Sequence, residues 1–371
     1  MSAALASHGL LFQGSPNAWV PSQRPLPAPL GHDGRCVNTS LLPCCPELRR
    51  QGQCQPLPMC LPSGKDLISD TIKAKGRWSD CSPLIHMWNQ SESRQGMGQV
   101  FLEVGANIGS CTLEMLYHTS ATCVVFEPNP RSLFHLTTSL RMAAVVMPSI
   151  LHRVFVFPMA AGNVSAAALL SETPGNAGGA HIGTFSERRR RAGNRTHQIL
   201  QQPIDKVIQL TSQSETSSLR RMTPIRLMKV DVEGFECNVL DGMRQLLHQR
   251  AVAAIKSEVS RDVLLRQGCS EEGLLLRLAS RSFSIKLDLG CVDCMGRPQA
   301  RCSKAKSMSR NKQRMYHRKG QYDVQALLTE SGERQWRNPA SLVKAILRRA
   351  VNKTAHLEDV RSQGMGENAD K

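Results

Sequence analysis

Residues 100–109 read Val-Phe-Leu-Glu-Val-Gly-Ala-Asn-Ile-Gly, and this stretch decides the fold. Its first five residues are apolar apart from Glu103, a composition typical of a buried parallel strand. The glycines at 105 and 109 let the chain turn tightly before residues 110–117, which can form a helix. A strand that turns through glycines into a helix brings backbone N–H groups close to a ligand. Because a buried carboxylate needs a partner, we expect Glu103 to face that ligand.

A second expected strand, residues 121–126, ends in Glu127-Pro128-Asn129. Glu127 lies 22 residues after Gly105, close to the offset at which nucleotide-binding βαβ units place an acid on ribose hydroxyls. Thr112 stands where the dinucleotide-binding motif Gly-x-Gly-x-x-Gly has its third glycine, so the sequence does not indicate a binding site for a pyrophosphate. This pattern favours S-adenosylmethionine over NAD as the ligand.

Three motifs, in this order and spacing, resemble the FkbM family of S-adenosylmethionine-dependent methyltransferases. They are Glu-Val-Gly-Ala-Asn-Ile-Gly at 103–109, Phe-Glu-Pro-Asn at 126–129 and Lys-Val-Asp-Val-Glu-Gly-Phe-Glu at 229–236, with Val-Leu-Asp-Gly at 239–242. The resemblance covers about residues 98–290, and the acidic motif at 229–236 is its most specific part. It implies an α/β fold of the Rossmann-like class I methyltransferase type, with a seven-stranded, mostly parallel sheet and helices on both faces.

Apolar runs predict where those seven strands lie: 100–104, 121–126, 153–157, 225–230, 252–255, 283–289 and 323–328. The expected organisation is a Pro/Cys-rich, largely irregular leader at 1–65, lead-in helices at 66–97, the methyltransferase domain at 98–329 with insertions at 171–196 and 290–322, and a C-terminal helix and tail at 330–371. Asn338 and Pro339 have the residue types of an N-cap and first helical position. The amphipathic helix that follows could dock on the domain or lie on an anionic membrane, and docking is favoured.

Acidic residues follow or end four of the predicted strands, namely Glu103, Glu127, Asp231 and Glu258. Ligands of open α/β sheets bind beyond the carboxyl ends of the strands, so these acids should converge on one site. The expected cofactor contacts are Glu103, Gly105, Ala106, Asn107, Gly109, Glu127, Asn129, Ala160 and Ala161. Among these, Glu127 would accept the ribose hydroxyls. The small residues 158–162 suit the flat face of an adenine or form a plain strand-end turn.

Methyl transfer to a hydroxyl needs alignment of the acceptor and a group that takes the acceptor's proton. Asp231 is the first candidate for that base, with Glu233 and His197 in reserve. The alternative for Asp231 is a structural acid that caps the next helix or pairs with Lys229. The sequence Asp-Val-Glu-Gly at 231–234 differs from the Asn/Asp-Pro-Pro-aromatic loop of base N-methyltransferases, so an oxygen acceptor is favoured. The family resemblance suggests a sugar, glycan or other small molecule.

The chain carries a formal net charge of +17, and residues 294–322 hold nine Lys and Arg and no acid. Such a segment can bind an anionic surface or form a solvated arm. Tyr316 and Tyr322 are its only aromatic residues, too few for stacking on single strands, so nucleic acid is not an expected partner. No apolar run of 18 residues exists, and no transmembrane span is predicted.

Thirteen cysteines are many for a cytoplasmic enzyme, and six of them precede the glycine loop: Cys36, Cys44, Cys45, Cys54, Cys60 and Cys81. This density predicts disulfides and an oxidising compartment. Five Asn-x-Ser/Thr sequons agree with it. Residues 1–20 lack the pattern of a signal peptide, so either the N-terminus is incomplete or the cysteines are unpaired. The secretory lumen is the favoured location and the cytoplasm the alternative.

Two further groups of cysteines lie downstream of these six. Cys111, Cys123 and Cys237 fall on core elements and are interpreted as packing residues. The set Cys291, Cys294, Cys302 and His317 could bind zinc, but one Cys-x-x-Cys favours a disulfide or free thiols, and no metal is expected.

Two other functions compete with the methyltransferase. An NAD(P)-dependent reductase on a similar sheet would need a Tyr-x-x-x-Lys pair, which the chain's three tyrosines do not provide. A catalytically silent, methyltransferase-like module that binds anions is the second alternative.

Overall fold

A computed structural model describes most of the chain. The described residues are 18–20, 23–28, 34–41, 55–64, 66–91, 99–173, 176–183, 195–212, 222–288, 321–328, 341, 343–344 and 346–347.

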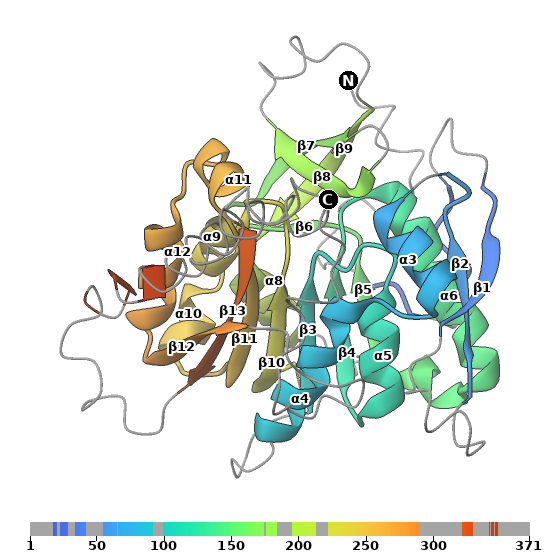
Figure 1. The fold of residues 1–371 in the computed structure, drawn as a ribbon, viewed down its shortest axis with the longest axis horizontal. Coiled ribbons are helices and arrows are strands. Elements are labelled where there is room, and N and C mark those ends of the chain that lie inside the picture. Colours follow the sequence, from blue (N-terminus) through green and yellow to red (C-terminus); the bar gives the residue numbers. More distant parts are fainter. Residues whose placement is uncertain are drawn as a thin grey trace, which may run out of the picture.

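A seven-stranded sheet forms the centre of the molecule (Figure 1). Its strands are β3 (Val100–Val104), β4 (Thr122–Phe126), β5 (Val154–Phe157), β10 (Ile225–Val230), β11 (Ala254–Ser260), β12 (Phe283–Asp288) and β13 (Gln321–Leu328). They lie in the order β12-β13-β11-β10-β3-β4-β5, and β13 alone runs antiparallel to its neighbours. The predicted seven-stranded, mostly parallel sheet is confirmed.

Burial on both faces explains why the strands read as continuous apolar runs. Every residue of β3 is buried; Val100, Leu102 and Val104 pack into one core cluster and Phe101 into another. Helices α4, α5 and α6 share the cluster of Phe101, whereas α8, α9, α10 and α12 share the cluster of Leu102. The predicted helices on both faces are therefore present.

The described helices begin and end at residues that suit those positions. They are α3 (Leu67–Lys75), α4 (Ser82–Ser91), α5 (Ser110–His118), α6 (Pro130–Val146), α8 (Ile204–Ser212), α9 (Glu236–Asp241), α10 (Arg244–His248), α11 (Arg261–Arg266) and α12 (Glu271–Ala279), with 3₁₀ turns η1 (Ser79–Cys81) and η2 (Pro148–His152). At the start of α6, the Asn129 side chain accepts a hydrogen bond from the Arg131 N–H, and Pro130 occupies the first helical position. At the end of α3, Gly76 adopts φ 72°.

A second sheet of four strands lies across one end of the first (Figure 1). Its strands are β6 (Ala160–Ala161), β7 (Ala166–Thr173), β8 (Asn176–Gly183) and β9 (Thr196–Gln202), in the order β6-β9-β7-β8. Residues 171–196 were predicted to be an insertion, and β8 lies within them. Glycine-rich β8 has a weak strand signal of its own, and it is held by its antiparallel pairing with β7.

The expectation of an irregular leader was wrong for two segments. Strands β1 (Val37–Leu41) and β2 (Leu57–Leu61) pair antiparallel. Leu57, Met59 and Leu61 are buried in the cluster shared with α6, while Pro58 in the same strand is less buried. A segment whose apolar residues alternate can thus form a strand despite a proline, because a strand with a single partner does not need every N–H group for pairing. Further upstream, Trp19 forms a β-bridge with Val156 of β5.

Three disulfides join described cysteines: Cys36–Cys60, Cys81–Cys111 and Cys237–Cys269. The interpretation of Cys111 and Cys237 as packing residues was therefore wrong, because each has a partner that sequence spacing does not reveal. Cys123 is a buried free thiol, as expected. Cys44, Cys45 and Cys54, and the set from Cys291 to His317, lie outside the described residues.

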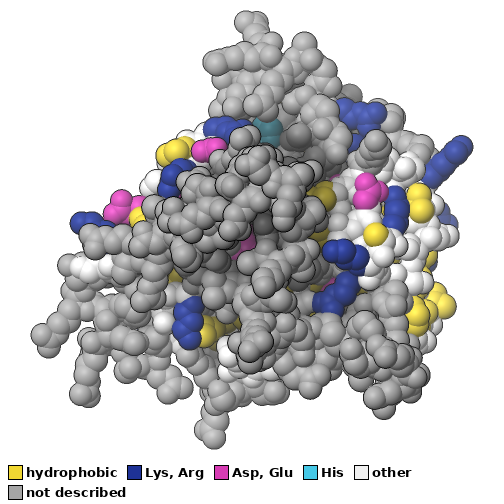
Figure 2. All heavy atoms as spheres, in the orientation of Figure 1, with side chains coloured by type: hydrophobic (Ala, Val, Ile, Leu, Met, Phe, Trp, Pro, Cys, Tyr) yellow, Lys and Arg dark blue, Asp and Glu magenta, His cyan; other side chains and the backbone are white. Residues whose placement is uncertain are grey.

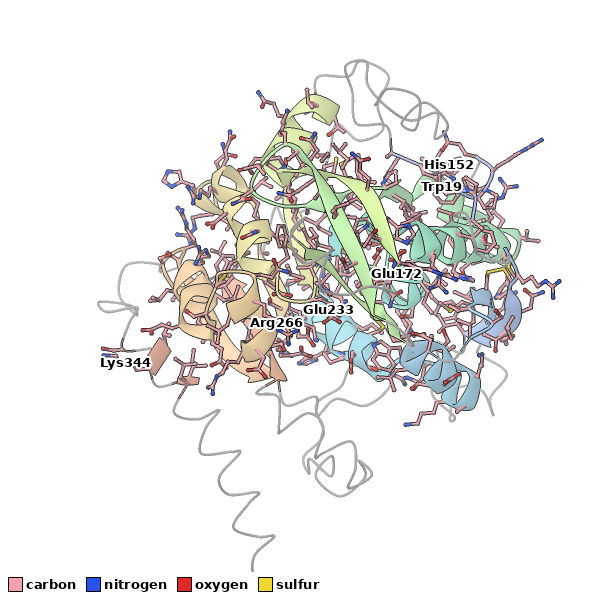
Figure 3. The ribbon with its side chains drawn as sticks, turned by 90° about the horizontal axis from the view of Figure 1, so that it is seen from above. Trp19, His152, Glu172, Glu233, Arg266 and Lys344 are labelled. Atoms are coloured by element: carbon pink, nitrogen blue, oxygen red, sulfur yellow. A yellow bond between two sulfur atoms is a disulfide. The ribbon has the colours of Figure 1, made fainter. Side chains whose placement is uncertain are left out.

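At the C-terminus, residues 341, 343–344 and 346–347 are helical. Val343 and Ile346 are buried in the main core, and Lys344 is exposed, at the outer edge of Figure 3. This packing agrees with the docking alternative. Asn338 and Pro339 are outside the described part of the chain. Among described residues, no helix has the length and apolar character needed to cross a bilayer.

Candidate active site

A pocket of about 570 Å³, a volume that includes its open mouth, lies at the carboxyl ends of β3, β4 and β10. Its walls include eight of the twelve predicted site residues: Gly105, Asn107, Glu127, Asn129, Ala160, Ala161, Asp231 and Glu233. Glu103, Ala106, Gly109 and His197 are not among the residues that line it. Segments more than 120 residues apart in sequence thus meet at one edge of the sheet, where ligands of such folds bind.

The glycine loop after β3 has positive φ angles at three positions, a conformation that glycine and asparagine adopt readily. Gly105 and Gly109 both adopt φ 85°, and Asn107 adopts φ 51°. A Cβ on Gly105 would lie 1.9 Å from the carbonyl oxygen of Asp231. Gly105 therefore lets the loop after β3 pack directly on the loop after β10. Gly109 is needed for a different contact, with Leu136 of α6.

Glu127 at the end of β4 is held by main-chain groups. One carboxylate oxygen accepts a hydrogen bond from the Asn107 N–H at 2.7 Å, and the other accepts from the Asn129 N–H at 2.8 Å. Burial raises the pKa of Glu127 to about 7, although those two N–H groups act in the opposite direction. Each carboxylate oxygen keeps a further lone pair, so Glu127 can still accept hydrogen bonds from a ligand in the pocket.

Asn129 adds an unused donor beside Glu127. Its side-chain oxygen caps α6, whereas its Nδ2 is buried and makes no hydrogen bond within the described part of the chain. Since a buried amide donor without a partner is costly, a ligand acceptor in this pocket would satisfy it. Ser132 also lines the pocket and donates to the Asn107 side-chain oxygen at 3.0 Å.

Glu103 faces the protein interior and not the pocket. It accepts a hydrogen bond from the Thr112 hydroxyl of α5, and one of its oxygens lies 3.8 Å from Nζ of Lys229. Burial raises the pKa of Glu103 to about 7, while Lys229 and Thr112 lower it. Its contacts agree with a role in fixing the glycine loop, because Thr112 belongs to the helix that follows the loop.

Asp231 lines the pocket and is also paired with Lys229. Nζ of Lys229 donates to Oδ2 of Asp231 at 2.9 Å, and the Asp231 side chain keeps 41% of its surface exposed. Burial acts to raise the pKa of Asp231, but Lys229 and Lys256 outweigh it and hold the pKa below its usual value. Asp231 is therefore an ionised carboxylate at the wall of the pocket, and the pairing with Lys229, given above as the alternative to a base, is present.

The next turn of the acidic motif presents Glu233 to the pocket. Glu233 adopts φ 52° and Gly234 φ 97°, and a Cβ on Gly234 would lie 2.5 Å from the Val263 carbonyl oxygen. Buried Glu236 holds this turn, since one of its oxygens accepts from the N–H groups of Val232 and Gly234. The last acid of the motif is thus structural, whereas the middle acid, Glu233, lines the pocket.

His197, on β9, lies beside the pocket in a small ionic cluster. Its Nε2 is 2.9 Å from a Glu172 oxygen, and the other oxygen of Glu172 accepts from Arg131 at 2.8 Å. The cluster lowers the pKa of Glu172 even though burial alone would raise it. His197 pairs across the strands with Leu170, which does line the pocket.

Strands β7 and β8 of the four-stranded sheet supply pocket residues that were not among the predicted site residues. Leu170 of β7 and the alternate residues Gly178, Ala180 and Ile182 of β8 line it, together with Phe235 and Val232 of the acidic motif and Ser132 of α6. The spacing of 178, 180 and 182 is a two-residue period, but glycine and alanine give it no apolar contrast.

Residues 294–320 of the basic segment that was predicted to bind an anionic surface lie outside the described residues. On the face drawn in Figure 2, the described Lys and Arg side chains are spread over the surface and do not gather in one patch.

Comparison with known proteins identifies the part of the chain that forms this site. Residues 103–263 match the family described as the methyltransferase FkbM domain. No curated protein matches the chain. Among solved structures, the chain is similar to a methyltransferase FkbM from Methylobacillus flagellatus, at 19% identity and a TM-score of 0.32, over 54% of this chain and 44% of that one. It thus spans less than half the length of that protein.

Two further structures are similar at lower identity. A precorrin-6y C5,15-methyltransferase from Geobacter metallireducens is 10% identical, with a TM-score of 0.30, over 67% of this chain and 87% of that one. An O-methyltransferase domain named StiE O-MT is 8% identical, with a TM-score of 0.31, over 67% and 73%. The family match begins at the last two residues of β3 and covers the glycine loop, Glu127 and the acidic motif, so the segment that forms the pocket is similar to the methyltransferase FkbM domain.

Proposed function

We propose that this domain is an S-adenosylmethionine-dependent methyltransferase that methylates a hydroxyl oxygen of a sugar, glycan or other small molecule. The observation that carries the proposal is the convergence of Gly105, Glu127 and Asp231 on one pocket from the ends of three adjacent strands. The match of residues 103–263 to a methyltransferase domain supports the reaction class.

The pocket residues fit an adenosyl group. The free lone pairs of Glu127 suit the two ribose hydroxyls, and the unpartnered Nδ2 of Asn129 suits an acceptor atom beside them. Ala160 and Ala161 form a small-residue wall, on which a flat ring can lie. When bound, the cofactor supplies an electrophilic methyl group on a sulfonium.

The acceptor site is proposed at Asp231 and Glu233. Both line the pocket from the loop after β10, and both present carboxylates to which a hydroxyl can donate a hydrogen bond. The low pKa of Asp231 makes it a weak base, so its main contribution is to hold the hydroxyl in line with the methyl group. Glu233 or Asp231 would take the hydroxyl proton as the new C–O bond forms and the bond between the methyl carbon and the sulfonium sulfur breaks.

Binding of S-adenosylhomocysteine, measured by calorimetry, tests this proposal. The reaction product is preferable to the substrate because it binds without turnover. We expect micromolar binding by the wild type and a large loss of affinity in Glu127→Gln. A glutamine can accept a hydrogen bond from only one of the two backbone N–H groups, because its other terminal group is an N–H₂ donor that would face the second N–H. A folded wild-type protein that does not bind would instead favour the catalytically silent module.

We also propose a location in the secretory lumen. Three disulfides among the described cysteines support it. So does the exposure of Asn38, Asn89 and Asn163, the three sequon asparagines that lie in described residues. Intact mass of protein from secreting cells, measured with and without reductant and glycosidase, is expected to show both paired cysteines and glycans. Unpaired, unmodified chains would point to the cytoplasm.

A further inference from the structure

Two buried lysines lie at the same level of neighbouring strands, and each pairs with one acid. Lys229 of β10 is in register with Lys256 of β11. Nζ of Lys229 donates to Asp231 at 2.9 Å, and Nζ of Lys256 donates to Asp323 of β13 at 2.6 Å. Asp231 lines the pocket, whereas Asp323 is not among the lining residues. The two ion pairs are therefore similar in kind, but only the first reaches the candidate active site.

The Lys229 ammonium also contacts an acid of the adjacent strand. Lys229 is opposite Glu103 of β3 in the strand register, and its Nζ lies 3.8 Å from a Glu103 oxygen. This distance makes an ion pair but is too long for a hydrogen bond. Only 7% of the Lys229 side chain is exposed, so the ammonium lies inside the protein, between an interior acid and a pocket acid. Its one short contact is with the pocket acid.

The main chain of Asp231 is already fixed by the loop after β3. The Asp231 N–H donates to the Val104 carbonyl oxygen at 3.0 Å, and Gly105 packs directly against the Asp231 carbonyl group. The side chain can still turn between staggered rotamers, since 41% of it is exposed. The hydrogen bond from Lys229 favours the one rotamer that places Oδ2 on the ammonium.

We propose that Lys229 is a positioning residue that holds the Asp231 carboxylate in one orientation toward the acceptor hydroxyl. Lys229 is not among the residues that line the pocket, so it acts through Asp231. Burial acts to lower the pKa of Lys229, but Asp231 and Glu103 outweigh it and raise the pKa, so the lysine stays an ammonium. The catalytic meaning of this inference rests on the proposed function, whereas the orientation of Asp231 does not.

A fixed carboxylate matters because methyl transfer requires the acceptor oxygen, the methyl carbon and the sulfonium sulfur to lie in line. A carboxylate that turns freely would hold the hydroxyl in several directions. Lys229 is itself anchored, because Glu103 accepts a hydrogen bond from Thr112 of α5, the helix that follows the glycine loop. The contacts thus connect the cofactor side of the pocket to the acceptor side, as preorganisation of a site requires.

NMR of protein labelled with ¹³C and ¹⁵N at aspartate tests the orientation directly. Three-bond couplings from Cγ of Asp231 to its main-chain N and C′ report the side-chain rotamer, and the signal is assigned by its absence in Asp231→Asn. We expect the couplings of a single rotamer in the wild type. Lys229→Met keeps an unbranched side chain but removes the ammonium, so the couplings should become rotamer averages.

Lys256→Met is the matched control. It removes a buried ammonium at the same level of the sheet together with its hydrogen bond to Asp323. Urea unfolding should therefore show a loss of stability in both methionine variants, but Asp231 should keep its single rotamer in Lys256→Met. Averaged couplings in the wild type, a single rotamer in Lys229→Met, or equal averaging in the two methionine variants overturns the inference.

A double variant covers the case in which Lys229→Met does not fold. The single change leaves the buried Glu103 carboxyl without its cation, which is costly. Adding Glu103→Gln removes that charge and keeps an oxygen that can accept from Thr112. Asp231 should show averaged couplings in this double variant and a single rotamer in Glu103→Gln alone, where Lys229 remains. A single rotamer in both contradicts the role of Lys229.

Calorimetry with S-adenosylhomocysteine separates this inference from the proposed function. If the ligand does not bind but the Asp231 rotamer depends on Lys229, the proposed function fails and the fixing of Asp231 by Lys229 stands. If the ligand binds and the rotamer is the same with and without the ammonium, the positioning role of Lys229 fails and the proposed function stands.

Discussion

The pocket presents two carboxylates that the protein holds in opposite ways. Glu127, at the end of β4, is held by two main-chain N–H groups. Asp231, at the end of β10, is held by a charged side chain, the Lys229 ammonium. Burial dominates at the first site and raises the pKa of Glu127 to about 7, whereas nearby lysines dominate at the second and lower the pKa of Asp231.

The difference suits two different tasks. Main-chain donors are fixed by the fold, so the Glu127 region suits recognition of an unchanging cofactor. Side-chain partners can exchange protons with their neighbours, so the Asp231 region suits a step in which a proton leaves the acceptor. Four changes to the protein or its conditions test this difference between the two regions.

Gly105→Ala should have the largest effect, because Gly105 is where the two regions touch. A Cβ would lie 1.9 Å from the Asp231 carbonyl oxygen, and φ is 85°. We expect a loss of about 3 kcal/mol in the free energy of unfolding and loss of cofactor binding.

Gly268→Ala is the matched control for that variant. Gly268 also has a positive φ, 74°, but no neighbouring atom of the described residues lies within 4 Å of the position that a Cβ would occupy. Its cost should be about 1 kcal/mol, the backbone term alone. Urea unfolding of both variants measures the difference, and equal costs would contradict the close approach of the two loops.

Glu127→Ala should weaken S-adenosylhomocysteine binding by about 2 kcal/mol, roughly 30-fold, through loss of charge-assisted hydrogen bonds. The fold should survive, since the variant leaves the strand ends in place. Calorimetry on the folded variant measures the change. An affinity within about threefold of the wild type would show that Glu127 does not accept hydrogen bonds from the ribose hydroxyls.

Cofactor affinity should fall below neutral pH, which sharpens the contrast between the two carboxylates. Free Glu127 has a pKa near 7, and ligand hydroxyls bind its ionised form. Below pH 7 a protonated Glu127 must therefore lose its proton when the ligand binds. The affinity should decline by up to about tenfold per pH unit below 7 and should level off above it. Calorimetry between pH 6 and 8 measures the trend; a flat profile would mean that Glu127 is already ionised throughout.

His197→Gln should have the smallest effect. His197 contacts Glu172 and does not line the pocket, so cofactor affinity should change less than about twofold and stability by about 1 kcal/mol. Calorimetry and urea unfolding provide both numbers. A methyl-transfer rate that falls more than tenfold at unchanged cofactor affinity would restore His197 as the base.

Local signals in the sequence were enough to predict the seven-stranded sheet and much of the pocket. Residues 100–104 form a nearly uninterrupted apolar run that only burial on both faces explains, and the offset from Gly105 to Glu127 follows from one βαβ unit. The apolar run and the offset both depend on residues that are close together in the sequence.

What the sequence could not reveal depends on distant partners. Glu103 was expected to face a ligand, but its partner Lys229 lies 126 residues further along the chain. The glycine-rich strand β8 is a strand because β7 pairs with it, and Cys81 and Cys237 found partners in Cys111 and Cys269. Pairings of this kind leave no periodic trace in either segment.

The short bridge between Trp19 and Val156 has a consequence for how the protein is handled. Main-chain hydrogen bonds of 2.7 and 2.9 Å join these residues, so the upstream segment closes the outer side of β5. An uncovered strand there would offer its N–H and C=O groups to another chain, the usual starting point for edge-to-edge aggregation. A shortened version that begins after residue 28 would lose this cover, and poor solubility of that version would then say nothing about the pocket.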